Sequence, residues 1–261
     1  LVADRRVRKV TFTGSREIGD RICRTAGIKK VTMELGSNSP VIVMPDADLD
    51  KVATVLAMTG YGNAGQTCIS TQRVLAAKKV YGELLRSLKP KVEALTTGNQ
   101  LDEKSKVGPM VKESEAVRVD SWINEAVAGG ARLVAGGGRR GAIYIPAVVA
   151  DVHPDMRISR DELFGPAVAV ASFDTIEEAI ALANDSIYGL AAGIFTDNVE
   201  WAMKFAREAE AGNLHINWGS QWRVDLMPYG GLKDSGFGKE GPRYAVEEMT
   251  ELKMVVFHLN S

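Results

Sequence analysis

The chain has 261 residues, with 32 lysines and arginines against 33 aspartates and glutamates, and a formal net charge of −1 at pH 7. This balance argues against a nucleic-acid-binding surface and leaves a small molecule as the expected partner. Two cysteines are too few for a disulfide framework, so we expect a reducing cytoplasm. No uncharged apolar run reaches membrane-spanning length and residues 1–6 lack a signal-peptide pattern, so we expect neither export nor membrane insertion.

A strand–helix–strand unit opens the chain. Residues 8–12 alternate as a strand does, residues 17–26 have helical periodicity after a short turn, and residues 30–35 predict a second strand. A parallel sheet that is buried on both faces needs further units beside this one, and none lies upstream. We therefore expect the chain to begin in the middle of a domain.

A second α/β unit follows, with an apolar strand at residues 41–44 and a helix at residues 49–61 that Asp48 caps. Further strands are predicted at residues 74–77, 147–152, 167–173, 191–195 and 213–217, with helical patterns between most of them. This alternation predicts an α/β fold with a mainly parallel sheet and flanking helices.

Two later segments stand outside this alternation. The glycine-rich residues 136–141 predict an exposed turn, because no helix follows them as a phosphate-binding loop would require. Residues 251–259 predict a strand with no hairpin partner of its own, which we expect to pair elsewhere in the domain or with another subunit.

Cys68 is the first candidate for a chemical role, because small and polar residues surround it and leave its thiol reachable. A buried structural cysteine is the alternative interpretation, and it fits Cys23 better, since Cys23 lies among apolar residues on a helical pattern. A thiol attacks as its thiolate, so a nucleophilic cysteine needs a base or a positive field nearby.

The base can be a histidine or a carboxylate. His153, His215 and His258 are not placed in a way that suggests a Cys–His pair, although distance along the sequence leaves such a pair open. Glu34 ends a predicted strand, at the edge of a parallel sheet where α/β folds build their sites. An ion-paired structural glutamate is the alternative. The presence of Cys68 favours Glu34 as a base.

Two glycine patterns are candidates for phosphate-binding loops. Gly14, Ser15 and Gly19 lie between a predicted strand and a helix, where free backbone N–H groups and the Ser15 hydroxyl can hold a phosphate. Their spacing differs from the dinucleotide-binding fingerprint. Residues 236–241 do have the Gly-x-Gly-x-x-Gly spacing, but no strand leads into them, so we interpret them as a glycine-rich turn.

Five short motifs resemble, in the same order, the motif series of the aldehyde dehydrogenase superfamily. They are VTFTGS at residues 10–15, MELG at 33–36, GQTC at 65–68, ELFGP at 162–166 and PYGG at 228–231. The resemblance runs over essentially the whole chain, but it corresponds only to about the last half of a family member.

The resemblance implies the oxidation of an aldehyde to a carboxylate with NAD or NADP. In the family, the cysteine that matches Cys68 attacks the aldehyde carbon, and the resulting thiohemiacetal gives up a hydride to the nicotinamide. The glutamate that matches Glu34 activates the water that hydrolyses the remaining thioester. An upstream asparagine that stabilises the oxyanion has no counterpart here, and losing such a donor typically costs about a hundred- to a thousandfold in rate. We therefore expect the 261-residue chain alone to be inactive.

The resemblance also implies the cofactor contacts. The motif with Gly14, Ser15 and Gly19 matches the pyrophosphate contact, and Leu35 matches a backbone contact to the carboxamide. Glu162 matches the residue that holds the nicotinamide ribose, and Phe164 the one that packs beside it.

The family's organisation implies that residues 1–36 and 228–249 belong to the cofactor-binding domain and residues 37–227 to the catalytic domain. Residues 250–261 match an oligomerisation strand of a homodimer or homotetramer. Three alternatives stay open. The first is an acylating relative that transfers the acyl group of the thioester to coenzyme A, although Glu34 as a water-activating base argues against it. The second is a truncated fragment that only folds or associates, and the third is a cysteine-dependent hydrolase, which needs His153 or His215 near Cys68.

The substrate is indicated by one local feature. Residues 222–225 resemble those of relatives that act on short hydroxylated or anionic aldehydes, such as lactaldehyde or phosphonoacetaldehyde. We expect the Arg223 guanidinium to face the tunnel that leads to Cys68 and to bind an anionic group. The alternative is a surface arginine paired with Asp225.

Overall fold

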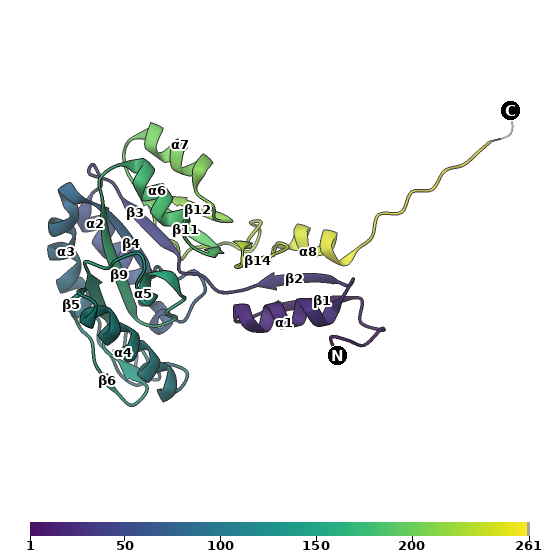
Figure 1. Ribbon diagram of the computed structural model, residues 1–261. Helices are drawn as coiled ribbons and strands as arrows, with labels where there is room; N and C mark the ends of the chain where they lie inside the picture. The colour runs from purple at the N-terminus through teal and green to yellow at the C-terminus, as the bar shows by residue number, and fades with distance from the viewer. Residues whose placement is uncertain (260–261) are drawn as a thin grey trace.

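A computed structural model describes residues 1–259 as an α/β structure with one large and one small sheet (Figure 1). The seven strands of the large sheet are, in spatial order, β12 (Asn213–Ile216), β11 (Ala191–Phe195), β3 (Pro40–Val43), β4 (Arg73–Ala77), β9 (Ala167–Phe173), β8 (Ala147–Ala150) and β5 (Arg132–Ala135). All neighbouring strands in it are parallel except β5 and β8. The α/β fold with a mainly parallel sheet is thus confirmed.

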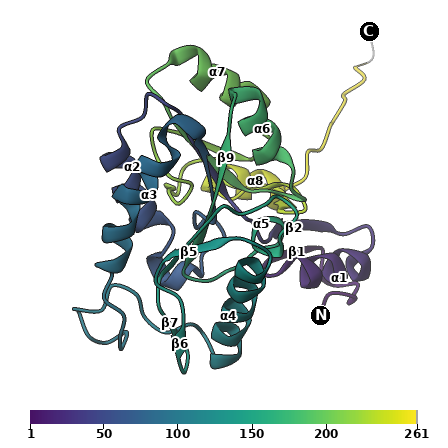
Figure 2. The same ribbon diagram turned by 60° about the vertical axis from the view of Figure 1, so that its left-hand side comes forward.

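Helices cover the large sheet on both faces. On one face lie α2 (Leu49–Thr59), α3 (Lys78–Glu93) and α4 (Glu113–Ala128), and on the other α6 (Ile176–Asn184) and α7 (Val199–Glu208) (Figure 2). Successive strand side chains point to opposite faces, so Val41 and Val43 of β3 pack in one apolar core and Ile42 packs in the other. This double burial explains why the strands are apolar without alternation.

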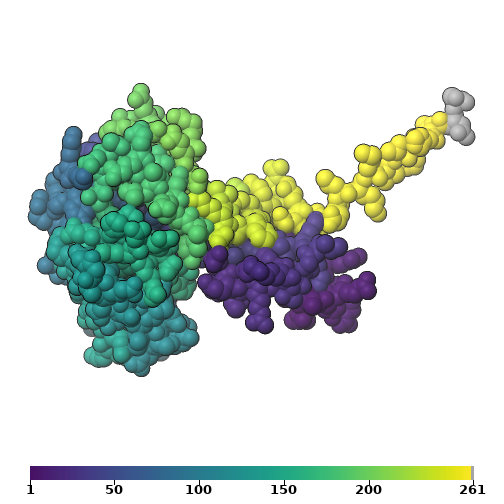
Figure 3. Space-filling view, viewed as in Figure 1, coloured from purple at the N-terminus to yellow at the C-terminus, as the bar shows by residue number. Residues whose placement is uncertain are grey.

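The small sheet joins segments from the two ends of the described chain. Its strands are β1 (Lys9–Thr13), β2 (Lys30–Glu34) and β14 (Gly236–Phe237), with α1 (Arg16–Ala26) and α8 (Pro242–Met249) beside them. In Figure 3 the purple N-terminal residues and the yellow C-terminal residues are in contact. β1 and β2 are parallel, and β14 pairs with β2 in the antiparallel sense.

The short elements complete the fold. They are the 3₁₀ helix η1 (Gly62–Gly65), the hairpin of β6 (Arg139–Arg140) and β7 (Ile143–Tyr144), the helix α5 (Arg157–Arg160), and the antiparallel pair of β10 (Tyr188–Gly189) with β13 (Leu232–Lys233). Of the predicted turn at residues 136–141, only Gly141 lies in the turn of this hairpin; Arg139 and Arg140 form β6, and residues 136–138 precede it. None of the helices in residues 1–259 combines the length and the apolar character needed to cross a membrane.

Several element boundaries differ from the sequence-based prediction by one or two residues, and one predicted strand is absent; the strand predicted at residues 147–152, for example, ends at Ala150. The helix predicted at residues 49–61 ends at Thr59, because η1 begins at Gly62 and Asn63 and Ala64 within it have left-handed backbone angles. Residues 251–259 form no strand, and their side chains are exposed, because no neighbouring strand in the described chain offers them a ladder. Residues 260–261 of the predicted oligomerisation strand lie outside the described residues.

Candidate active site

The largest cleft has a volume of about 860 Å³ and lies between the two sheets, where β1 and β2 end. This volume falls in the range of small-molecule and cofactor sites. Seven of the nine residues singled out from the sequence line it: Gly14, Ser15, Glu34, Leu35, Cys68, Glu162 and Phe164. The other two, Gly19 and Arg223, do not line it.

Cys68 lies in a loop that packs closely against the backbone of Gly165 at the position of Gly65. Gly65 has a φ of +69°, and a Cβ built on it would lie 2.1 Å from the carbonyl oxygen of Gly165. Only glycine therefore fits at this approach. The loop leaves the Cys68 thiol partly exposed and turned into the cleft.

The Cys68 thiol has a mixed electrostatic environment. Burial is the main factor and raises its pKa, and the nearby Glu34 and Glu162 raise it further. The Sγ atom lies 3.3 Å from the hydroxyl oxygen of Tyr229, which lowers the thiol pKa. Stabilisation of the thiolate therefore depends on hydrogen-bond donors.

Glu34 ends β2 and is 2% exposed. Neither of its carboxyl oxygens has a hydrogen-bond partner within the described chain. Burial raises the pKa of this carboxyl to about 8; the neighbouring Glu240 adds to the shift, while Lys239 and Arg223 oppose it. A carboxyl group with free lone pairs and a pKa near neutrality, in the same cleft as a thiol, is suited to accept a proton.

Glu162 and Phe164 also line the cleft. The Ser37 N–H donates to Oε1 of Glu162 over 2.8 Å, and a Cβ on Gly36 would lie 2.4 Å from Oε2, so the carboxylate is pressed against backbone. Burial raises the pKa of Glu162 to about 7. Phe164 has a φ of +47°, a costly conformation for a residue with a side chain.

The start of α1 borders the cleft. Ser15 caps the helix, and its hydroxyl accepts from the N–H of Ile18 over 3.5 Å. The positive end of the helix dipole therefore points to the side where Gly14 and Ser15 line the cleft, as anion binding requires. Gly19 has a packing role instead, because a Cβ there would lie 2.5 Å from the Leu35 side chain.

Sequence reasoning missed the contribution of α4 to this cleft. Glu115, Arg118 and Trp122 line it, with Arg118 donating to the carbonyl oxygen of Leu163 over 2.8 Å. The Arg118 guanidinium lies 4.9 Å from the Trp122 ring centre. The spacing of Glu115, Arg118 and Trp122 places them on one face of a helix, and the sequence alone predicts this. No sequence pattern near them, however, indicates that this face borders the cleft.

Arg223 lies behind the cleft wall. Its guanidinium stacks 4.3 Å from the ring centre of Tyr229 and forms an ion pair with Glu240 over 2.7 Å. The pairing with Asp225, the alternative considered from the sequence, is not among the ion pairs of the described chain. One side chain, that of Tyr229, separates Arg223 from Cys68.

The histidines are not part of this cleft. His153 is exposed and bonded to Asp155, and His215 stacks edge-on against Trp222. Neither lines the cleft, so a Cys–His hydrolase has no support from the geometry. No group of three or more histidine, cysteine, aspartate or glutamate side chains within residues 1–259 is placed to hold a metal ion.

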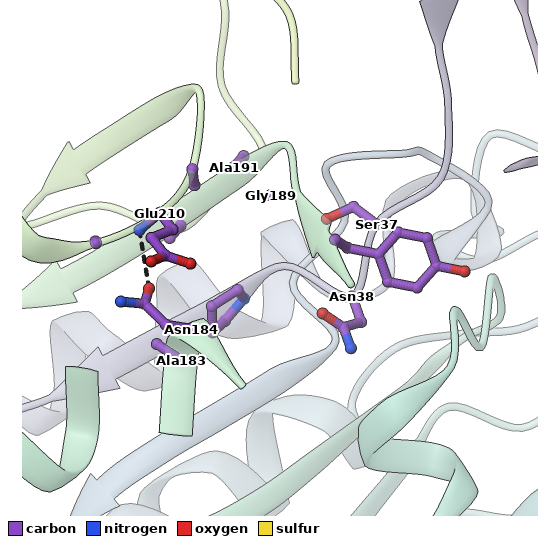
Figure 4. A pocket seen from close by; sticks show the side chains of 12 residues that line it. Ser37, Asn38, Ala183, Asn184, Gly189, Ala191 and Glu210 are labelled. Atoms are coloured by element: carbon purple, nitrogen blue, oxygen red, sulfur yellow. Dashed lines mark hydrogen bonds between the residues drawn. The ribbon is translucent and has the colours of Figure 1, made fainter. Parts of the chain in front are cut away.

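A second, closed hollow has a volume of only about 10 Å³ (Figure 4). Asn38, Asn184 and Glu210 surround it, and the Glu210 N–H donates to Oδ1 of Asn184 over 2.8 Å. This space suffices for about one water molecule. The hollow is therefore a packing feature and does not compete with the large cleft as a ligand site.

The profile of the aldehyde dehydrogenase family matches residues 1–255. A 3-sulfolactaldehyde dehydrogenase from Priestia aryabhattai is 49% identical over 259 residues, covering 99% of this chain and 54% of that protein. A lactaldehyde dehydrogenase from Methanococcus maripaludis is 41% identical over 253 residues, covering 97% of this chain and 54% of that protein. The chain thus spans about half the length of these curated relatives.

Solved structures agree. The glyceraldehyde-3-phosphate dehydrogenase GapN from Methanocaldococcus jannaschii, complexed with NADP, superposes with a TM-score of 0.94 at 37% identity, over 97% of this chain and 55% of that one. A Mycobacterium tuberculosis aldehyde dehydrogenase complexed with NAD+ gives 0.91 at 36% identity, over 96% and 53%. The fold is that of these α/β enzymes. The chain belongs to the aldehyde dehydrogenase family.

Proposed function

We propose that the protein carrying this chain oxidises an aldehyde to a carboxylate with NAD+ or NADP+. The observation that carries the proposal is the presence of the Cys68 thiol and the unpaired, buried Glu34 carboxyl in one cleft. Family membership supports the same reaction class. A chain that only folds or associates is not favoured, because it has no need for a buried carboxyl without partners.

In the proposed reaction, the Cys68 thiolate attacks the aldehyde carbon and forms a thiohemiacetal. A dinucleotide held by the residues of this cleft would supply the oxidant that takes up the hydride, and Cys68 would then carry the acyl group as a thioester. Glu34 then takes a proton from water as the water attacks the thioester carbon, and the carboxylate product leaves. Hydrolysis is preferred to transfer to coenzyme A, because Glu34 provides a base for water in the cleft.

The volume of the cleft is in the range of cofactor sites, and structural neighbours are complexed with NADP or NAD+. The start of α1 with Gly14 and Ser15 would hold the pyrophosphate, since both line the cleft at the positive helix end. Glu162 would hold the nicotinamide ribose, with Phe164 beside it and Leu35 near the carboxamide. Gly19 would act indirectly, by letting α1 pack on Leu35.

We propose the domain organisation on the same basis. The small sheet, built from residues 1–36 and 228–249, would belong to the cofactor-binding domain, and residues 37–227, which hold the large sheet, to the catalytic domain. Residues 250–261 would join two subunits of a homodimer or homotetramer.

For the substrate, we propose a short hydroxylated or anionic aldehyde. The relatives named above act on 3-sulfolactaldehyde and lactaldehyde, according to their names. Arg223 would recognise an anionic group, because its guanidinium keeps further N–H donors beside the one that bonds to Glu240. Because the Arg223 guanidinium stacks on the Tyr229 ring, the anionic end of a substrate bound at Cys68 would have to extend past this ring to contact it.

The Cys68→Ala variant of the full-length protein tests the function. We expect aldehyde-dependent formation of NADH or NADPH to fall to background, while the thermal unfolding temperature stays close to that of the wild type, because the substitution removes a single atom from a partly exposed side chain. Cys23→Ala is the matched control and should retain activity, since Cys23 lies on α1 and does not line the cleft. Turnover by Cys68→Ala would contradict the proposal.

A further inference from the structure

Tyr229 is the buried side chain that touches the nucleophile. It is 3% exposed and packs with Ile69 and Leu190 around Cys68. Its hydroxyl oxygen lies 3.3 Å from Sγ of Cys68, and within residues 1–259 the hydroxyl has no other hydrogen-bond partner. A tyrosine hydroxyl buried this deeply usually finds a partner, and here that partner is the thiol.

Two contacts of Glu240 fix the tyrosine ring in place. The Glu240 N–H donates to the carbonyl oxygen of Tyr229 over 2.7 Å, which anchors its backbone. The Glu240 carboxylate also holds Arg223, whose guanidinium covers the ring at 4.3 Å. The hydroxyl is thus positioned before any substrate binds.

The direction of the hydrogen bond follows from the acidities of the two groups. Burial raises the pKa of Tyr229 far above its ordinary value, so the phenol keeps its proton and cannot act as a base. A thiolate has no proton to donate. Once Cys68 ionises, Tyr229 is therefore the donor and sulfur the acceptor.

The charged surroundings make this donor consequential. Burial disfavours a negative charge on Cys68, and Glu34 at the end of β2 and Glu162 act in the same direction. The Tyr229 hydroxyl acts against them. Arg223, Lys239 and Glu240 lie around Glu34, and their charges act on its pKa.

We propose that Tyr229 is a catalytic residue that donates a hydrogen bond to the Cys68 thiolate and holds the sulfur in position for attack on the aldehyde. The inference rests on the proposed function, in which Cys68 is the nucleophile. During attack a sulfur lone pair forms the C–S bond, the C=O π pair moves to oxygen, and the phenol proton stays on Tyr229. The hydrogen bond then weakens, because a thioether sulfur is a poor acceptor.

The magnitude of the effect can be anticipated. Removing one donor to a thiolate should raise its apparent pKa by about one unit, which lowers the thiolate fraction about tenfold below that pKa. Thiolate nucleophilicity rises only about threefold for the same change, since its dependence on pKa has a slope of about 0.4–0.5. Tyr229→Phe should therefore react about threefold more slowly at low pH and about threefold faster at high pH.

The test measures alkylation of Cys68 by iodoacetamide between pH 6 and pH 10, in the full-length protein, followed by mass spectrometry of the peptide that contains Cys68. We expect the Tyr229→Phe and wild-type profiles to cross. Tyr81→Phe is the matched control, because the Tyr81 hydroxyl bonds to Asp151 away from the cleft, and its profile should match the wild type. Superimposed profiles, or a uniform change at all pH values, would overturn the proposal.

A second variant is used if Tyr229→Phe does not fold. Incorporation of 3-fluorotyrosine at position 229 keeps the ring and makes the hydroxyl a stronger hydrogen-bond donor, so the apparent pKa of Cys68 should fall. An unchanged pKa would overturn the proposal. Because alkylation of Cys68 does not require catalytic turnover, this test is independent of the proposed function. Failure of the proposed function would appear as aldehyde oxidation by Cys68→Ala, and failure of this inference as an unchanged alkylation profile.

Discussion

Glu34 is held in a state that costs folding free energy. A buried carboxyl without hydrogen-bond partners is more stable protonated, and its pKa of about 8 expresses that cost. The same isolation leaves both lone pairs free for a water molecule in the cleft. A residue that only stabilised the fold would gain from a hydrogen-bond partner, so its isolation favours a chemical role.

We expect Glu34→Gln to slow thioester hydrolysis. The first turnover should proceed as a burst of NADH or NADPH, and steady-state turnover should fall about a hundred- to ten-thousandfold, the usual contribution of a general base. In the wild type, steady-state turnover should rise as the pH passes through about 8. The pKa of Glu34 is raised to about 8, and only its deprotonated carboxylate can accept a proton from water. Rapid-mixing kinetics across this range decides the question, and a variant with no burst and an unchanged pH profile would exclude Glu34 as the base.

Arg223→Lys tests substrate recognition. Lysine keeps the charge but loses the planar guanidinium that stacks on Tyr229 and that, in our proposal, binds the anionic group with two donors. We expect kcat/KM for a short anionic aldehyde to fall about ten- to a hundredfold, corresponding to the loss of one charge-assisted contact. An uncharged aldehyde of similar length is the control and should change little. Equal losses for both aldehydes would indicate that Arg223 acts only by positioning Tyr229.

At the scale of elements, local sequence patterns predict a strand or helix correctly where burial of apolar side chains determines it. The apolar residues 167–173 and 191–195 form strands with the predicted bounds, and Asp48 caps α2 as predicted. The pairing of β14 with β2 was not predictable, since two residues after a glycine-rich stretch carry no strand periodicity. That pairing depends on tertiary contact and not on propensity.

Gly236 is the residue that permits this pairing. Its φ is +119°, and a Cβ there would lie 1.9 Å from the carbonyl oxygen of Met33. We expect Gly236→Ala to separate β14 from β2 and to lower the thermal unfolding temperature by several degrees, since backbone strain and a steric clash add. Gly138→Ala is the matched control: its φ of +83° is also left-handed, but no atom lies within 4 Å of its Cβ position. Equal shifts for both variants, measured by calorimetry, would show that backbone strain alone matters.

At the scale of the molecule, the site was predictable in part. Cys68 and Glu34 are candidates from their immediate neighbours in the sequence, and the structure places both in one cleft. The contact of Tyr229 with Cys68 joins residues 161 positions apart, and the placement of Arg223 behind that ring follows from it. Such contacts form only when distant parts of the chain fold together, and a local sequence pattern does not predict which distant residues meet.

The described part of the C-terminal segment exposes a run of apolar side chains. Residues 251–259 follow α8 without forming a strand, and Leu252, Phe257 and Leu259 are 105%, 82% and 87% exposed. An extended segment with free backbone groups and apolar side chains is suited to pair with another chain. This is the basis for proposing that residues 250–261 join two subunits.

We expect the Phe257→Lys, Leu259→Lys double variant of the full-length protein to form smaller assemblies than the wild type, because charged side chains on a pairing segment oppose strand addition and desolvation. Light scattering coupled to size-exclusion chromatography measures the change as a loss of molar mass to that of a smaller oligomer or a monomer. Leu101→Lys is the matched control, since Leu101 is 85% exposed but lies in a loop after α3, and its mass should equal that of the wild type. If the double variant keeps the wild-type mass, the subunits associate through another surface, and the exposed apolar side chains of this segment need a different partner.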